Sequence, residues 1–354
     1  MDVSAIELQL RQVDVAFSKS RINVYSDKKK EQHYNELYDL FCAIDQAPKS
    51  GLISENELNI HFQILNYILN GLEYLDSSTL NNIPFEIVSC LEYVLDEWIV
   101  DKNFIIVTSL SNRHLEYLFS TYFNAELFSS LNEFIKEKYN LSITNRLIRI
   151  TLPKSLSRDY LASMVLYHEL GHFIDSELAV STKFIAKKYG FDKINDHISE
   201  FKHTKEYFAD IFAAQYINDA SNYFLERITP NGADLDNYSH PSLTKRKNTV
   251  EGFLEGTNIH ILKEFNNILK YSENTTLKRR HKLIDEELSC FNKLIPENIE
   301  SKEELHSVFK LAWDIWLNSD NNFLKNFSSK EKYNVINNLV EKTISNYTIL
   351  EKWN

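Results

Sequence analysis

Two histidines stand four residues apart in the stretch LYHELGHFID, and a glutamate directly follows the first of them. If this stretch is helical, His168 and His172 lie on one face and can present ring nitrogens to a single metal ion. Glu169 is then turned by roughly 100° from His168. That places its carboxylate beside the ion, where it can take a proton from a bound water. The pattern predicts a zinc site with a general base; the alternative is a helix with two unrelated histidines.

A zinc ion that catalyses hydrolysis needs a third protein ligand, and the segment KEYFADIFAAQYI offers one. Glu206 and Asp210 are four residues apart and would share one helix face. Glu206 can complete the ligand set, while Asp210 can accept a hydrogen bond from the outer nitrogen of His168 and fix its ring. Small residues on this face, and Gly171 on the other helix, would let the two helices approach closely. The alternative is an ordinary amphipathic helix with solvated acids.

A third group of polar residues follows in the stretch SHPSLTKR. Pro241 suits the first position of a helix, which would place His240 at the N-terminal cap. From there His240 and Arg246 could direct donors toward an oxyanion that forms during hydrolysis. A helix-capping histidine and a surface arginine are the alternative for this segment.

Other residues could enter the ligand set. Asp175 would be the third ligand if Glu206 is not, because some zinc enzymes carry the pattern H-E-x-x-H-x-x-D. Either Asp175 or His203 could also fill the fourth position, which would close the site and make the zinc structural. Otherwise His197 and His203 are expected at the surface or at a helix cap.

The order of these segments resembles that of the gluzincin metallopeptidases. The matching segments are H-E-L-G-H at 168–172, E-Y-F-A-D at 206–210 and H-P-S-L-T-K-R at 240–246. The order is most similar to that of soluble relatives of the CAAX-prenyl-protease-like peptidases and of bacterial phage-exclusion metallopeptidases. The resemblance extends over roughly residues 148–253, under a third of the chain.

This resemblance implies a role for each matched residue. The implied roles are zinc ligand for His168, His172 and Glu206, general base and acid for Glu169, hydrogen-bond partner of a ligand for Asp210, and transition-state donor for His240 and Arg246. The resemblance also implies a zincin-like core. In such a core a short edge strand, here RLIRITLP, lies next to the active-site helix and pairs with an extended substrate.

The elements that position these residues are expected to be mainly helices, with a small β-sheet. The chain has only 7 Gly and 6 Pro, whereas average usage would give roughly 40 such residues, and long helices tolerate few of either. The segments 103–110 and 146–153 are short and β-branched, so both are strand candidates. We expect one or two helices between them, over 113–139. A helix from about residue 157 carries HELGH, with Ser155 or Ser157 as its cap.

We expect three regions, with soft boundaries near residues 140 and 258. A helical region (1–140) precedes the catalytic core (141–257), whose main irregular loop spans 218–240, and a second helical region (258–354) follows. These boundaries do not have the composition of linkers, so one continuous fold is the alternative. The helical flanks resemble no family and could bind a regulatory partner or select the substrate.

The composition of the chain bears on which partners it can bind and on where in the cell it is expected. A net charge of −11 disfavours a broad nucleic-acid or anionic membrane surface. Three widely spaced cysteines are typical of buried thiols in a reducing compartment. The N-terminus has no signal-peptide pattern, and no apolar run approaches the ~18–20 residues that span a bilayer. We therefore expect a cytoplasmic protein with no membrane span.

Together these patterns predict a soluble, intracellular zinc endopeptidase that hydrolyses a protein substrate with metal-activated water. The resemblance adds a regulated toxin-like or phage-defence role. The rival hypothesis is a helical binding or scaffold protein in which zinc is structural or absent. Three protein ligands and an open position would favour the enzyme, and four ligands the scaffold.

Overall fold

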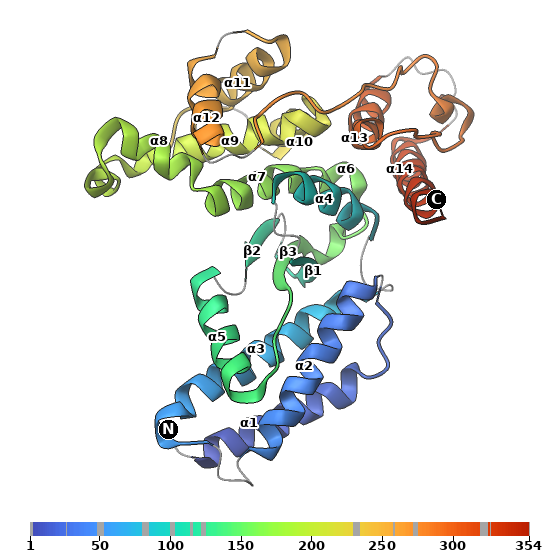
Figure 1. The fold of residues 1–354 in the computed structure, drawn as a ribbon. Coiled ribbons are helices and arrows are strands. Elements are labelled where there is room, and N and C mark those ends of the chain that lie inside the picture. The colour runs from blue at the N-terminus through green and yellow to red at the C-terminus, as the bar shows by residue number, and fades with distance from the viewer. Residues whose placement is uncertain are drawn as a thin grey trace. The chain divides into compact units, whose positions relative to one another are not determined.

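The structure is a computed structural model of the chain. It describes residues 3–25, 27–47, 53–79, 85–99, 103–113, 116–121, 125–228, 234–257, 259–271, 275–318, 325 and 327–353. These residues are mainly helical and include one small three-stranded sheet (Figure 1), so the predicted fold class is confirmed at this level. The chain divides into two compact units. One comprises Met1–Phe85 and Asp101–Ser157, and the other comprises Glu86–Val100 and Arg158–Asn354.

The boundaries predicted near residues 140 and 258 do not coincide with this division. Residue 140 lies within the first unit because the strand that follows it pairs with a strand that precedes it. Residue 258 lies within the second unit because the helices on either side of it pack on other helices of that unit. Helix α4 (Phe85–Trp98) lies early in the chain, yet its Trp98 indole donates to the Tyr216 hydroxyl of the second unit (2.8 Å).

In the first unit, three helices pack together through one apolar core. They are α1 (Val3–Ser20), α2 (Lys28–Gln46) and α3 (Leu58–Ser77). The buried residues of this core recur at three- and four-residue spacing along each helix, as the sequence pattern predicts. Helix α3 also packs against the sheet, which completes the core on that side.

The sheet has the strand order β1-β3-β2. Strand β3 (Arg146–Pro153) runs parallel to β1 (Phe104–Ser111) and antiparallel to β2 (Leu118–Thr121). The prediction that RLIRITLP is an edge strand is therefore wrong, because β3 is central and has partners on both sides over residues 148–151. Its apolar residues are buried on both faces, which is typical of a central strand.

Strand β2 falls in the segment 113–139 that was predicted to be helical. It has only four residues, and its pairing with β3 is a long-range contact that local sequence preference does not reveal. The rest of that segment does contain a helix, α5 (Ala125–Tyr139), which ends where the prediction placed its end.

The second unit is built around α9 (Ile198–Ile217). Every residue of α9 from Phe208 to Ile217 is buried, because other helices surround it. Its neighbours are α7 (Val165–Leu178), α8 (Val180–Tyr189), α10 (Ala220–Ile228), α11 (Leu243–Glu255) and α13 (Lys302–Leu317). Helix α12 (His260–Tyr271) packs on α8, and α14 (Ser329–Trp353) packs on α13 (Figure 1). Short 3-10 turns occur at Glu55–Glu57, Lys154–Leu156, Phe191–Lys193, Asn195–His197 and Cys290–Lys293.

Helix α10 occupies part of the segment 218–240 that was predicted to be an irregular loop. The described remainder, 234–240, is irregular as expected. The loop prediction rested on the polar residues in this segment. Nine residues are enough for a helix because Ala220 and Ser221 are buried and α9 packs alongside.

The helix that carries HELGH begins later than predicted. A short helix, α6 (Tyr160–Ser163), precedes α7, and its cap is Asp159, whose carboxylate accepts from the Ala162 amide (3.0 Å). Aspartate with an extended backbone is a favoured cap. The Ser157 hydroxyl donates instead to the carbonyl of Lys154 (3.2 Å), so the predicted serine cap is wrong.

The structure also bears on the expectations about a membrane span and about the cysteines. Among the described residues, no helix has both the length and the apolar content needed to cross a bilayer. All three cysteines are free thiols, but only Cys90 is fully buried. The expectation of buried thiols is wrong for Cys42 and Cys290, which are partly exposed.

Candidate metal centre

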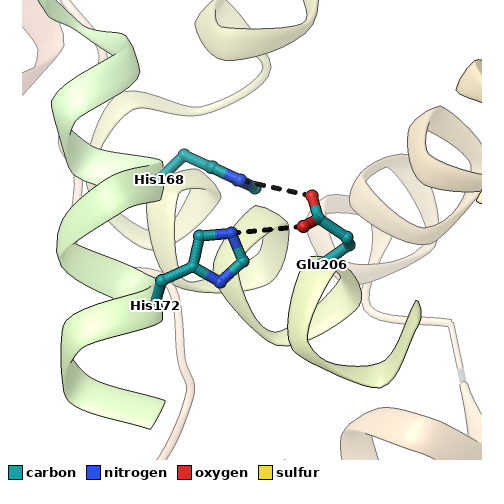
Figure 2. Close-up of side chains that lie close together, drawn as sticks. All are labelled: His168, His172 and Glu206. Carbon is teal, nitrogen blue, oxygen red and sulfur yellow. Dashed lines mark ion pairs between the residues drawn. The ribbon is translucent and has the colours of Figure 1, made fainter. Parts of the chain in front are cut away.

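His168 and His172 project from consecutive turns of α7 toward α9. Their ring centroids are 4.6 Å apart and their planes cross at 84°. The side chain of His168 is buried, whereas that of His172 is 23% exposed. The Nε2 atoms of both rings face the carboxylate of Glu206 on α9 (Figure 2). The two segments that the sequence singled out are therefore brought together.

The spacing of these donor atoms suits a shared metal ion. Nε2 of His168 lies 3.5 Å from Oε2 of Glu206, and Nε2 of His172 lies 3.3 Å from Oε1. The ligand atoms of the three residues all lie within 4.8 Å of one another. Both distances are long for a hydrogen bond. They are close to the separation of about 3.3–3.4 Å between two ligand atoms of a tetrahedral zinc ion with bonds of about 2.0–2.1 Å.

Close packing of α7 on α9 brings the ligands to this spacing. A Cβ atom added to Gly171 would lie 2.8 Å from the Cα of Ala209 and 3.1 Å from the Cβ of Phe212. No larger side chain fits there without separating the helices. The predicted role in this close approach is confirmed for Gly171 and Ala209.

Asp210 lies behind the ligands and is fully buried. Its Oδ1 is 2.9 Å from Nδ1 of His168, close enough to orient the ring, although without the directionality of a full hydrogen bond. Arg246 on α11 binds Asp210 through two hydrogen bonds, Nε to Oδ2 and a terminal nitrogen to Oδ1, both 2.7 Å long. Asp210 therefore links His168 to a buried guanidinium.

Arg246 has different partners from those expected. Besides Asp210, its other terminal nitrogen lies 3.3 Å from Oε2 of Glu206. Its donors are therefore directed at two buried carboxylates. This arrangement suits a residue that holds Glu206 and Asp210 in place better than one that donates directly to an oxyanion.

His240 reaches the site from the solvent side. Its Nε2 lies 3.6 Å from Oε1 of Glu206, and its side chain is 52% exposed. The prediction that His240 caps α11 is wrong. The cap is Ser242, whose hydroxyl accepts from the Lys245 amide (3.3 Å), and His240 lies two residues before it. Serine is preferred there because its short hydroxyl reaches an unpaired amide of the first turn.

The alternative ligands lie elsewhere. Asp175 accepts a hydrogen bond from the Ser181 amide (2.7 Å) at the start of α8. Nε2 of His203 lies 2.8 Å from the carbonyl oxygen of Asn237, and the ring of His197 stacks on Tyr189. Among the histidines, cysteines and acids in the described part of the chain, only His168, His172 and Glu206 form such a cluster.

The charges of the site shift its pKa values in opposite directions. Burial alone lowers the pKa of His168, but contacts with Asp210 and Glu206 outweigh it and raise the pKa well above its usual range. Burial also opposes ionisation of Glu206, yet both histidines lower the pKa of its carboxyl strongly. For His172 burial dominates and lowers the pKa. The charged form of the Glu206 carboxylate is therefore stabilised by the groups that face it and not by solvent.

Glu169 is partly buried beside this cluster. Burial raises the pKa of its carboxyl, and the charge of Glu206 raises it further, while His168 and Arg246 act in the opposite sense. A carboxyl with a raised pKa is suited to accepting a proton and returning it.

The segment before α11 contains functional candidates that the sequence reasoning missed. The side chain of Asp236 accepts a hydrogen bond from the Ser242 amide (2.8 Å), and that of Asn237 accepts one from the His240 amide (2.7 Å). These two bonds fix the backbone on either side of Pro241 and so help to place His240. The signal was present, because Asp and Asn at close spacing ahead of a helix cap are typical of such turns.

Comparison with known protein families, with curated proteins and with solved structures finds no match to this chain.

Proposed function

We propose that this chain is a zinc-dependent peptidase of the gluzincin kind that hydrolyses peptide bonds of a protein substrate. One observation carries the proposal: the ligand atoms of His168, His172 and Glu206 all lie within 4.8 Å of one another, and the two imidazole Nε2 atoms face the two oxygens of the one carboxylate, close enough for the three residues to share an ion. Two imidazoles and one carboxylate are also the donor set of known catalytic zinc sites. The proposed catalytic core is therefore formed by α7 and α9.

His168, His172 and Glu206 would hold the zinc, which would polarise the scissile carbonyl and lower the pKa of the attacking water. Glu169 would accept a proton from the attacking water at its carboxylate and return it to the leaving amine. As an imidazolium, whose Nδ1 donates to the Ser239 hydroxyl, His240 donates from Nε2 to the carbonyl oxygen as negative charge develops there. Arg246 and Asp210 act through the ligands, by holding Glu206 and orienting His168.

The contacts of the alternative ligands weigh against a closed structural site. A fourth protein ligand would favour the scaffold hypothesis. Both candidates for that position, Asp175 and His203, are engaged with backbone groups outside the cluster. These contacts support the proposal, in which Asp175 and His203 are not ligands.

The decisive test separates binding from chemistry. Glu169→Gln keeps the shape of the side chain but removes the base. The purified variant is expected to hold about one zinc per chain and to unfold at the same temperature as the wild type, yet to produce no cleavage. Zinc is measured by elemental analysis. Cleavage is measured as new protein N-termini in cells that express the wild type or the variant, with and without phage infection. The proposal would be refuted if cells with the wild type and cells with Glu169→Gln show identical N-termini both with and without infection.

A further inference from the structure

The turn that carries His240 is built around one asparagine. Oδ1 of Asn237 accepts hydrogen bonds from the amides of Ser239 (2.8 Å) and His240 (2.7 Å), and the amide of Asn237 donates to the carbonyl of His240 (3.0 Å). The Ser239 hydroxyl bridges Oδ1 of Asn237 (3.0 Å) and Nδ1 of His240 (2.7 Å). Both the backbone and the ring of His240 are therefore tied to Asn237.

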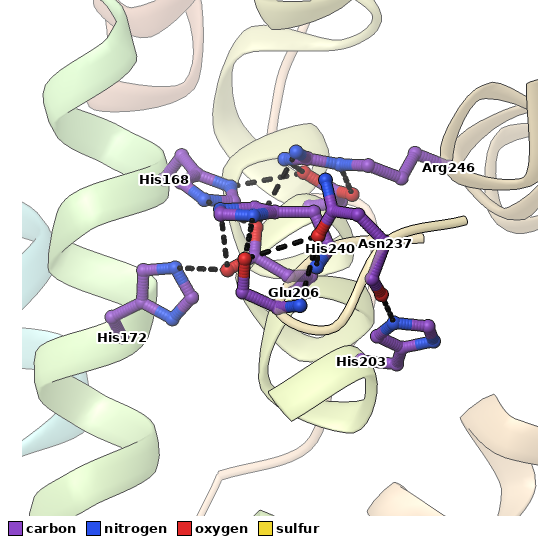
Figure 3. A network of polar contacts seen from close by, with 9 residues as sticks. His168, His172, His203, Glu206, Asn237, His240 and Arg246 are labelled. Carbon is purple, nitrogen blue, oxygen red and sulfur yellow. Dashed lines mark hydrogen bonds and ion pairs between the residues drawn. The ribbon is translucent and has the colours of Figure 1, made fainter. Parts of the chain in front are cut away.

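The same turn is tied to the helix that carries Glu206. Nε2 of His203 on α9 lies 2.8 Å from the carbonyl oxygen of Asn237 (Figure 3). A carbonyl only accepts, so the histidine is the donor. His203 precedes Glu206 by three residues and lies on the same side of α9. A second tie is the cation–π contact of Lys202, whose Nζ lies 4.2 Å from the ring centroid of Tyr238.

We propose that His203 and Asn237 are positioning residues that hold the His240 ring against the ligand cluster. This inference rests on the proposed function, in which Nε2 of His240 donates to the reacting oxygen. The side chain of His240 is half exposed and lies outside any helix or strand, so its orientation depends on these ties. A displacement of about 1 Å at a reacting group can cost on the order of 100-fold in rate. Neither His203 nor Asn237 belongs to the ligand cluster.

The first experiment uses the zinc-loaded protein and a mixture of internally quenched peptides. His203→Ala is expected to lower kcat/KM about tenfold, a part of the effect of misplacing a reacting group, with the zinc content unchanged. If His203 acts through His240, the substitution His203→Ala causes no further loss of kcat/KM in a protein that already carries His240→Ala. His203→Gln retains an N–H donor and is expected to recover most of the rate. His260→Ala, at an exposed histidine on α12, is the matched control.

The second experiment does not depend on activity. Hydrogen exchange of the backbone amides of Ser239 and His240 is expected to rise about tenfold in Asn237→Ala, which removes their acceptor. Asn237→Asp keeps an acceptor oxygen and is expected to preserve the protection. His203→Ala is expected to raise exchange in the same segment, while the amides of α12 stay unchanged.

Two results would overturn the inference: unchanged exchange in both Asn237→Ala and His203→Ala, or an equal loss of rate with and without His240. If His203→Ala does not fold, as judged by circular dichroism, the two Asn237 variants decide the question. A wild type that cleaves none of the peptides would count against the proposed function alone. The exchange measurements would still decide whether His203 and Asn237 hold the turn.

Discussion

Two histidines are buried in the second unit, and their surroundings differ in kind. His168 faces the carboxylates of Glu206 and Asp210. His306 on α13 faces aromatic side chains instead: its Nδ1 lies 2.7 Å from the hydroxyl of Tyr167, and its ring packs edge-on against Tyr216. Tyr167 directly precedes His168 in the chain, so α7 contributes to both clusters.

The electrostatics follow from these neighbours. The carboxylates raise the pKa of His168 despite its burial. Burial and the like charge of Lys302 lower the pKa of His306 to about 3, which keeps it neutral. Burying carboxylates and a guanidinium costs more than burying aromatic rings. The difference teaches that His306 belongs to an ordinary core, whereas the charges around His168 favour a role in binding a cation.

The largest expected contrast is in metal content. His172→Ala removes one of three ligands and is expected to reduce zinc from about one per chain to almost none after dialysis against a weak chelator. His306→Gln, the matched change in the aromatic cluster, is expected to keep it. Elemental analysis of both proteins checks this. Full zinc in His172→Ala would mean that the cluster is not the binding site.

A second contrast concerns the contact between α7 and α9. Gly171→Ala puts a methyl group 2.8 Å from the backbone of Ala209. Overpacking of this kind costs about 1–3 kcal/mol, and the separated helices should also bind zinc more weakly. Ser176→Ala on the exposed face of α7 is the control, expected to change neither quantity. Denaturant unfolding and zinc competition measure the two effects. Unaltered zinc affinity in Gly171→Ala would show that the close approach does not set the ligand spacing.

A smaller contrast separates the two buried aspartates of the second unit. Asp210→Asn weakens the orientation of His168 and is expected to lower zinc affinity roughly 10–100-fold, as for other groups that orient a ligand. Asp175→Asn makes the same change where the carboxylate accepts from the Ser181 amide at the start of α8, and is expected to change affinity much less. Competition with a chromophoric chelator gives both values. The reverse ranking would make Asp175 the third ligand.

The last contrast is a pH dependence that belongs to the aromatic side chains around His306. In the folded protein His306 has a pKa of about 3, whereas in the unfolded chain it takes up a proton near pH 6.5. Its contribution to stability is thus complete above pH 6.5 and is lost as the pH falls toward 3. By pH 5 the loss is about 2 kcal/mol.

His306→Gln does not titrate, so its free energy of unfolding should fall less than that of the wild type between pH 7 and pH 5. Urea denaturation at both pH values gives the comparison. Parallel declines in the two proteins would show that His306 is not kept neutral by burial.

Sequence patterns predicted the helical class and the β3 segment, because both depend on local composition and spacing. They also selected His168, His172 and Glu206, which the structure brings together. Residues four apart share a face of any helix, so each half of the ligand cluster is encoded within a few residues. The close approach at Gly171 and Ala209 could also be predicted from the sequence, because small side chains on the facing sides of two helices permit close packing.

Long-range contacts decided the rest. β3 is central because the short strand β2 pairs with it, and the boundaries of the two units follow from pairings between distant segments. The partners of Arg246 depend on how α11 lies against α9. The place of His240 depends on a turn held by Asn237 and His203. The sequence by itself determined which residues could bind a metal, because helical spacing is local. Only the tertiary structure decided which side chains surround them, because those contacts join residues far apart in the chain.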